Sequence, residues 1–87
     1  MLQPFDSTPK YAVHFKTNLC GVTVKVYDIN KTHIVREKNN HADENELMIM
    51  LPKGDFYVIA SKETPSKTYV CETTITVPVN STIYLRL

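Results

Sequence analysis

Histidine and cysteine are the side chains of this 87-residue sequence best suited to catalysis, but their spacing does not build a catalytic group. The histidines are His14, His33 and His41, and the cysteines are Cys20 and Cys71. Nucleophilic catalysis needs a nucleophile beside a base that a third group orients. The histidines are scattered, and Cys71 would meet one of them only by an accident of folding. We therefore expect no catalytic residues and no enzyme activity.

The polar stretch 38–45 and the residue after it hold the densest group of metal-ligating side chains. These are His41, Asp43, Glu44 and Glu46. They could hold a cation loosely, but their spacing matches no ligand pattern known to us, and a solvated acidic loop is the favoured interpretation. Two glycines, Gly21 and Gly54, are too few for a phosphate-binding glycine-rich loop. We expect no metal and no cofactor.

The two cysteines leave one structural alternative open. Cys20 and Cys71 could form a single bridge, but two cysteines in 87 residues are not a disulfide scaffold. Free thiols, with Cys71 facing inward as a structural residue, are the favoured interpretation.

Charge and hydropathy exclude two classes of partner. Ten Lys and Arg against nine Asp and Glu give a formal net charge of +1, far from the basic excess of nucleic-acid-binding domains. The longest apolar run covers residues 47–51, well short of the roughly 18–20 residues that span a bilayer. We expect neither nucleic acid nor a membrane as a partner.

The elements that would position any site are strands, because apolar residues recur with period two along most of the chain. The clearest case is Val22, Val24 and Val26, which alternate with polar residues. The segment 56–61 is apolar on both faces, so it should lie centrally. The pattern predicts seven strands, at about residues 11–16, 22–27, 32–37, 46–51, 56–61, 68–77 and 82–87.

Seven short strands at regular spacing without a helical pattern predict an all-β fold. We expect a single seven-stranded antiparallel Greek-key β-sandwich, immunoglobulin-like or transthyretin-like, over residues 11–87. Residues 1–10, which contain Pro4 and Pro9, should form an extended N-terminal arm. The run Leu51 to Ser61 should end one strand at Pro52 and start the next at Gly54.

Several segments resemble a known family of modules. They are 21–28 (GVTVKVYD), 51–58 (LPKGDFYV) and 74–77 (TITV), with Asn80-Ser81-Thr82 before Leu85. Over residues 20–87 the chain resembles carboxypeptidase-regulatory-like and collagen-adhesin B-type repeats, and it is similar to PEGA modules in its proline-glycine-aromatic turn. The resemblance implies a seven-stranded transthyretin-like sandwich that acts as a spacer, an adhesive unit or a display domain.

The resemblance also raises the question of an internal crosslink. Many adhesin repeats carry a Lys–Asn isopeptide bond promoted by a buried acid, and Lys16 or Lys25 could pair with Asn80 beside Glu72. Strand parity places both lysines and Glu72 opposite the apolar faces. Solvated side chains are therefore the favoured interpretation.

Apolar and aromatic residues outside the expected core point to a protein interface. Exposed aromatic and methionine side chains are enriched at such interfaces. The alternative, that another sheet or loop covers these side chains, stays open. The candidate interface residues are Leu2 and Phe5 in the arm, and Tyr27, Met48, Met50, Tyr57, Ile59 and Tyr84 on the nominal outer faces of the strands. We expect docking through the arm and an apolar-aromatic sheet face.

These features predict a non-enzymatic structural or interaction module. The first six residues lack the pattern of a secretory signal, so a display-type domain would reach the outside by cell lysis. We therefore expect an accessory component of a larger assembly, such as an auxiliary capsid, decoration or tail protein of a bacteriophage virion. The alternative is an excised repeat of a bacterial surface or secreted protein that binds protein or carbohydrate ligands. Its location would then be the bacterial cell surface, and a cytoplasmic location is also open.

Overall fold

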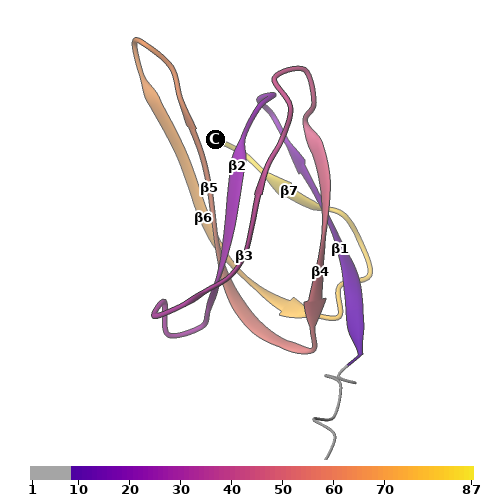
Figure 1. Ribbon diagram of the computed structural model, residues 1–87. Coiled ribbons are helices and arrows are strands. Elements are labelled where there is room, and N and C mark those ends of the chain that lie inside the picture. Colours follow the sequence, from indigo (N-terminus) through magenta and orange to yellow (C-terminus); the bar gives the residue numbers. More distant parts are fainter. Residues whose placement is uncertain (1–8) are drawn as a thin grey trace, which may run out of the picture.

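The chain forms two facing β-sheets (Figure 1). The computed structural model describes residues 9–87, and over that range it contains seven strands and no helix. The order is β4-β1-β7 in sheet A and β3-β2-β5-β6 in sheet B. The all-β, two-sheet prediction is therefore confirmed. The strands are β1 (Lys10–Thr17), β2 (Thr23–Asp28), β3 (Ile34–Asn39), β4 (Glu46–Pro52), β5 (Gly54–Glu63), β6 (Thr68–Val77) and β7 (Ile83–Leu85).

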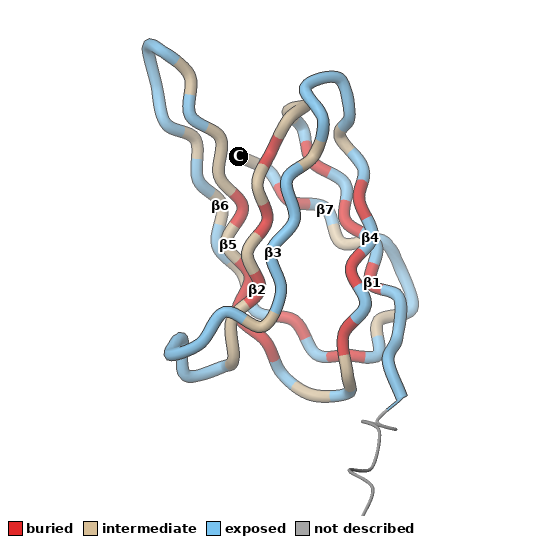
Figure 2. Tube along the Cα trace, viewed as in Figure 1, coloured by how far each residue is buried: buried red, intermediate tan, exposed pale blue. Residues whose placement is uncertain are grey.

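The core is one apolar layer between the two sheets. Successive side chains of a strand point to opposite faces, so alternate residues can be buried while their neighbours stay in water. Figure 2 shows this alternation along both sheets. In β4, for example, Leu47, Ile49 and Leu51 are buried while Met48 and Met50 are exposed. The largest fully buried side chains are Val13, Phe15 and Thr17 from β1, Val22 beside β2, Val24 and Val26 from β2, Leu51, Val58, Val77 and Leu85.

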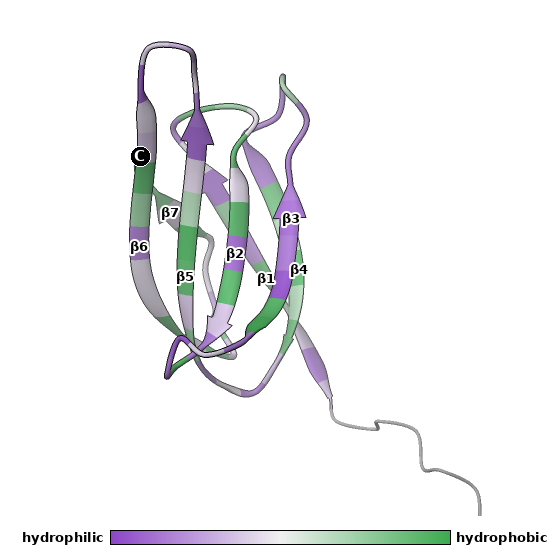
Figure 3. Ribbon diagram, turned by 60° about the vertical axis from the view of Figure 1, so that its left-hand side comes forward, coloured by the Kyte–Doolittle hydropathy of each residue, from purple (hydrophilic) through white to green (hydrophobic). Residues whose placement is uncertain are grey.

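The strand that is apolar on both faces lies centrally, as predicted. β5 pairs with β2 on one side and β6 on the other. Its inner residues Phe56, Val58 and Ala60 are buried, and Tyr57 on the outer face is only 8% exposed. Figure 3 shows green, apolar segments in the middle of β5 and alternating with polar ones in β2, and a β3 that is hydrophilic beyond its first residues.

The prediction of a purely antiparallel fold is wrong for sheet A. β1 pairs antiparallel with β4 but parallel with β7, where Phe15, Lys16 and Thr17 face Ile83, Tyr84 and Leu85. Parallel neighbours need a long crossover, and the five strands β2 to β6 supply it. Residue alternation is the same in parallel and antiparallel strands, so periodicity alone does not distinguish them.

Strand order separates this fold from a constant-type immunoglobulin domain. In that domain the first and second strands share a sheet. Here β1 lies in sheet A and β2 in sheet B.

Every strand except β6 differs from its predicted bounds by one or two residues at one end or both. β1 starts at Lys10, one residue inside the expected arm, and the rest of that arm up to residue 8 lies outside the described residues. β3 starts at Ile34 rather than residue 32, because Thr32 and His33 donate their amides to the Asp28 carboxylate instead of to a strand. β7 is limited to Ile83–Leu85. Beyond β7, Leu87 exchanges two hydrogen bonds with the Asn18 side chain at 2.7 and 2.9 Å.

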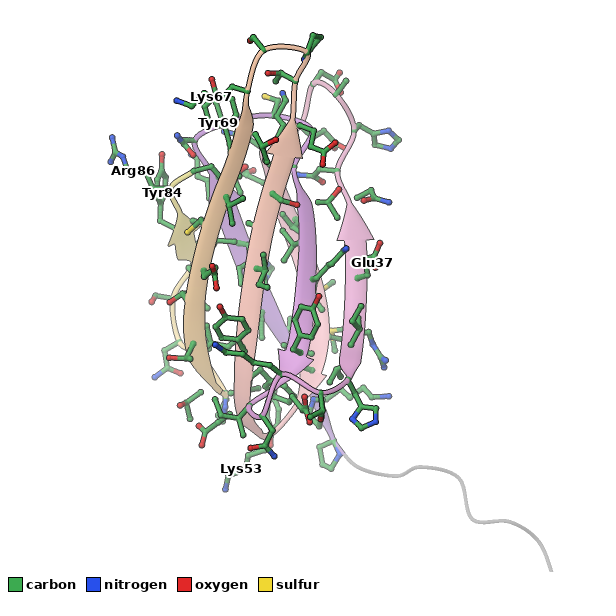
Figure 4. The ribbon with its side chains drawn as sticks, turned by 90° about the vertical axis from the view of Figure 1, so that its left-hand side faces the viewer. Glu37, Lys53, Lys67, Tyr69, Tyr84 and Arg86 are labelled. Atoms are coloured by element: carbon green, nitrogen blue, oxygen red, sulfur yellow. The ribbon has the colours of Figure 1, made fainter. Side chains whose placement is uncertain are left out.

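Between β4 and β5 the chain passes from sheet A to sheet B through a single connecting residue, Lys53. Pro52 closes β4 opposite Lys10, and Gly54 opens β5 opposite Val77. Lys53 projects into solvent at this corner (Figure 4). Gly54 has a φ of 147°, a conformation that only glycine adopts without strain.

Replacing Gly54 with valine should lower the free energy of unfolding by about 1–3 kcal/mol through backbone strain. An added Cβ would meet only the Phe56 ring at 3.8 Å, an ordinary contact, so the loss would not arise from a clash. Urea denaturation measures this change. The neighbouring Lys53→Val is the matched control, and equal stability of the two variants would contradict the account.

Candidate functional site

The residues with catalytic potential lie apart in the structure. His14 lies on β1, His33 in the β2–β3 loop and His41 in the β3–β4 loop. Over residues 9–87 no group of three or more His, Cys, Asp or Glu side chains is placed to hold a metal ion. In the expected acidic loop, His41 Nε2 lies 3.9 Å from a Glu44 carboxylate oxygen, and both side chains are largely exposed. In the same part of the chain no helix is long and apolar enough to cross a bilayer.

The two cysteines are not bonded to each other, and the two lysines considered for a crosslink lie on different sheets. Cys20 and Cys71 are free thiols, each partly buried. Lys16 lies on the outer face of sheet A, with its ammonium 3.8 Å from Glu46. Lys25 belongs to sheet B, on the outer side of β2, because its neighbours Val24 and Val26 point inward. The two candidate lysines thus lie on opposite outer faces.

The predicted interface residues do not form one surface. Leu2 and Phe5 lie outside the described residues. Tyr27, Tyr57 and Ile59 lie on the outer face of sheet B, where Tyr27 pairs with Tyr57 across β2 and β5. The other three lie on the outer face of sheet A: Met48, Met50 and Tyr84. The six described candidates are thus divided between the two outer faces, because each sheet turns its own outward residues away from the shared core.

The aromatic pair on sheet B is partly covered. The Tyr27 and Tyr57 ring centroids are 6.3 Å apart with the planes tilted by 57°. Lys31 lies over Tyr57, with Nζ 4.1 Å from the ring centroid, which is cation–π geometry. A shallow hollow of about 330 Å³ remains, lined by Tyr27, Lys31, Tyr57, Ile59 and Glu72.

The loop between β2 and β3 holds Lys31 over the ring. The Asp28 carboxylate accepts hydrogen bonds from the Thr32 hydroxyl at 2.6 Å, the Thr32 amide at 2.7 Å and the His33 amide at 3.0 Å. Lys31 itself has a φ of 63°, an unusual backbone conformation for a side chain with a Cβ. The Thr32 hydroxyl and the His33 amide lower the pKa of Asp28 to about 2.

The outer face of sheet A carries three exposed apolar side chains. Met48 is 41% exposed, Met50 39% and Tyr84 53%. The register places Met48 beside His14, Met50 beside Ala12 and Tyr84 beside Lys16 on this one face. Figure 4 shows Tyr84 projecting away from the sandwich. A hollow of about 390 Å³ lies here, lined by His14, Phe15, Lys38, Glu46, Leu47, Met48 and Thr82.

Two polar residues that sequence reasoning missed lie at the border of this face. Lys38 Nζ donates to the Met48 carbonyl at 3.4 Å, and Asn40 Nδ2 donates to the Glu46 carbonyl at 3.1 Å. Both come from β3 or the loop after it, so they connect sheet B to the edge of β4. Their sequence context, a polar run, carries no signal for this contact.

Comparisons with protein-family models, with curated proteins and with solved structures find no match to this chain.

The Asp28 hydrogen bonds make a pH-dependent contribution to the β2–β3 loop. The pKa is lowered from 3.8 to about 2 in the folded chain, so this contribution is complete above pH 3.8 and is lost as pH falls toward 2. Carboxyl NMR titration should therefore give a midpoint near 2. Thr32→Val should raise the midpoint part of the way, because the two backbone donors remain.

Thr64→Val is the matched control for this titration. The Thr64 hydroxyl serves the other hairpin of sheet B, where it donates to the Lys67 carbonyl at 2.9 Å. The control should leave the Asp28 midpoint unchanged. A wild-type midpoint at the ordinary value of 3.8 would contradict the hydrogen-bond account.

Proposed function

We propose that this chain is a non-enzymatic interaction module that joins a larger protein assembly through the outer face of sheet A. The observation that carries the proposal is the set of exposed side chains Met48, Met50 and Tyr84 on that face. Methionine adapts its shape to a partner, and methionine and tyrosine are enriched at protein interfaces. The core of a two-sheet domain lies between the sheets and needs no apolar residue on an outer face. Apolar side chains on the outer face of sheet A therefore support contact with a partner protein.

The setting we propose for this assembly is a bacteriophage virion, with the chain as an auxiliary capsid, decoration or tail protein. Support comes from the resemblance of residues 20–87 to display and spacer modules, together with the exposed outer face. The strand order, with β1 and β2 in different sheets, favours a transthyretin-like over an immunoglobulin-like arrangement within the proposed resemblance.

The proposal predicts that the double variant Met48→Glu, Met50→Glu no longer binds its assembly. In gradient fractions from the native source, the wild-type tagged chain should sediment with a particle much larger than itself. The double variant should lose about tenfold or more of that association, because charge replaces desolvated apolar contacts. Melting temperature checks that the fold is retained.

Ile29→Glu with Ile34→Glu is the matched control, since these residues are also exposed and apolar but lie in or beside the β2–β3 loop. The control should sediment with the particle. A wild-type chain found only at its free size, or a Met48/Met50 variant that still sediments with the particle, would contradict the proposal.

The alternative function, a repeat of a bacterial surface or secreted protein, is favoured by a different observation. The hollow beside Tyr27 and Tyr57 combines aromatic surface with the charged groups of Lys31 and Glu72. Ligand sites commonly combine an apolar or aromatic wall with a few polar groups, and a carbohydrate ring fits that description.

Oligosaccharides of bacterial surfaces should then shift the amide NMR signals of Tyr27 and Ile59, and Tyr27→Ala should remove the shifts. His14 on the opposite outer face serves as the internal reference and should not move. Equal shifts at both faces, or none at Tyr27, would contradict carbohydrate binding at this hollow.

A further inference from the structure

An open two-sheet fold leaves four strands at sheet edges, and they differ in how well they are blocked. β4 and β7 border sheet A, and β3 and β6 border sheet B. The outer N–H and C=O groups of an edge strand can pair with another strand unless the edge is short, bulged, charged or covered.

Three of the four edges carry blocking features. On β4, the Glu46 and Met48 carbonyls already accept hydrogen bonds from the Asn40 and Lys38 side chains. β3 is charged along its middle, where Arg36, Glu37 and Lys38 follow one another, and its pairing with β2 is interrupted by a bulge. β7 is only three residues long.

β6 has none of these features. It is ten residues long, pairs with β5 in unbroken register, and contains no proline. Glu72 is its single charged residue, and the five consecutive residues 73–77 are all valine, isoleucine or threonine. These β-branched residues favour extended pairing. Among residues 9–87 no strand pairs with the outer edge of β6.

The half of β6 next to the β5–β6 hairpin is also incompletely buried on its inner side. Tyr69, Cys71 and Thr73 point inward but are only partly buried, whereas Ile75 and Val77 are buried. Figure 1 shows the reason: the β5–β6 hairpin extends past the opposite sheet. Figure 4 shows Tyr69 near this free end, where the Lys67 ammonium lies 4.8 Å from the ring centroid.

We propose that β6 pairs antiparallel with β6 of a second copy of this chain, with the two-fold axis at Thr74, so that two sheets B form one eight-stranded sheet. In this register Thr74 faces Thr74 of the second copy, Glu72 faces Thr76, and Cys71 faces Val77. Threonine pairs opposite one another are favourable in sheets.

Glu72, the one charged residue of β6, favours this register over its neighbours. The small net charge of the chain allows a second copy to approach this edge. An axis at Glu72 would oppose the two carboxylates directly, and an axis at Thr73 would place them diagonally, whereas an axis at Thr74 separates them. The net charge of each copy is +1, so long-range repulsion between copies is small. A two-fold contact uses the same patch on both copies, and β6 is self-complementary in this sense.

The contact is one strand wide, so it falls at the low end of interface sizes and predicts a concentration-dependent dimer. Light scattering or sedimentation equilibrium should show one chain mass near about 1 μM and approach two chain masses by about 1 mM. A chain that remains monomeric at about 1 mM would overturn the proposal.

Charge substitutions at the axis test its position. Thr74→Lys and Thr74→Glu each place like charges opposite one another and should weaken the dimer roughly five- to thirtyfold. An equal mixture of the two variants should restore dimerisation, because lysine then faces glutamate. Thr74 is exposed in the single chain, so both variants should keep the wild-type melting temperature.

Ile34→Lys places the same charge on β3, the opposite edge of sheet B, and should dimerise as the wild type does. A dimer that Thr74→Lys leaves intact, or a mixture that stays monomeric, would overturn pairing at Thr74. The Met48 and Met50 variants leave β6 unchanged, so failure of this dimer and failure of the proposed assembly face are separate results.

Discussion

The apolar layer shared by the two sheets is the constraint on which the rest of the structure depends. Each strand gives alternate side chains to that layer, as β4 does with Leu47, Ile49 and Leu51. A small two-sheet fold has little apolar surface to spare, so its inner positions are occupied almost entirely by aliphatic and aromatic residues. The one buried polar residue among the described ones, Thr17, donates its hydroxyl to the Leu19 carbonyl at 2.6 Å.

The same constraint decides what each outer face and edge can present. On sheet B, Asp28 orders the loop that carries Lys31, and Lys31 in turn lies over Tyr57, so the aromatic pair on this face is partly covered within the chain. On sheet A, Met48 and Met50 have no such cover from the described residues. Because neither sheet closes on itself, edges also remain, and they differ. Side chains of Lys38 and Asn40 bind carbonyl groups at the β4 edge, whereas no strand among the described residues pairs with the outer edge of β6.

Sequence reasoning succeeded where a local pattern carries the information. Period-two alternation identified the inner faces of β2, β4 and β6, and the apolar character of both sides of residues 56–61 identified the central strand. It failed where the outcome depends on partners distant in the chain. The parallel β1–β7 pairing is the clearest case, because it follows from tertiary placement. The start of β3 was missed because Asp28 competes with the strand for two amides.

Amide hydrogen exchange at two protein concentrations tests the central claim, that β6 is the edge this fold leaves open for a second copy. Alternate residues of an edge strand point their N–H groups outward, and pairing protects those amides. At high concentration, we predict increased protection at alternate residues around Thr74 in β6 and unchanged exchange in β3. Unchanged exchange along β6, or protection that increases in β3 instead, would contradict the account.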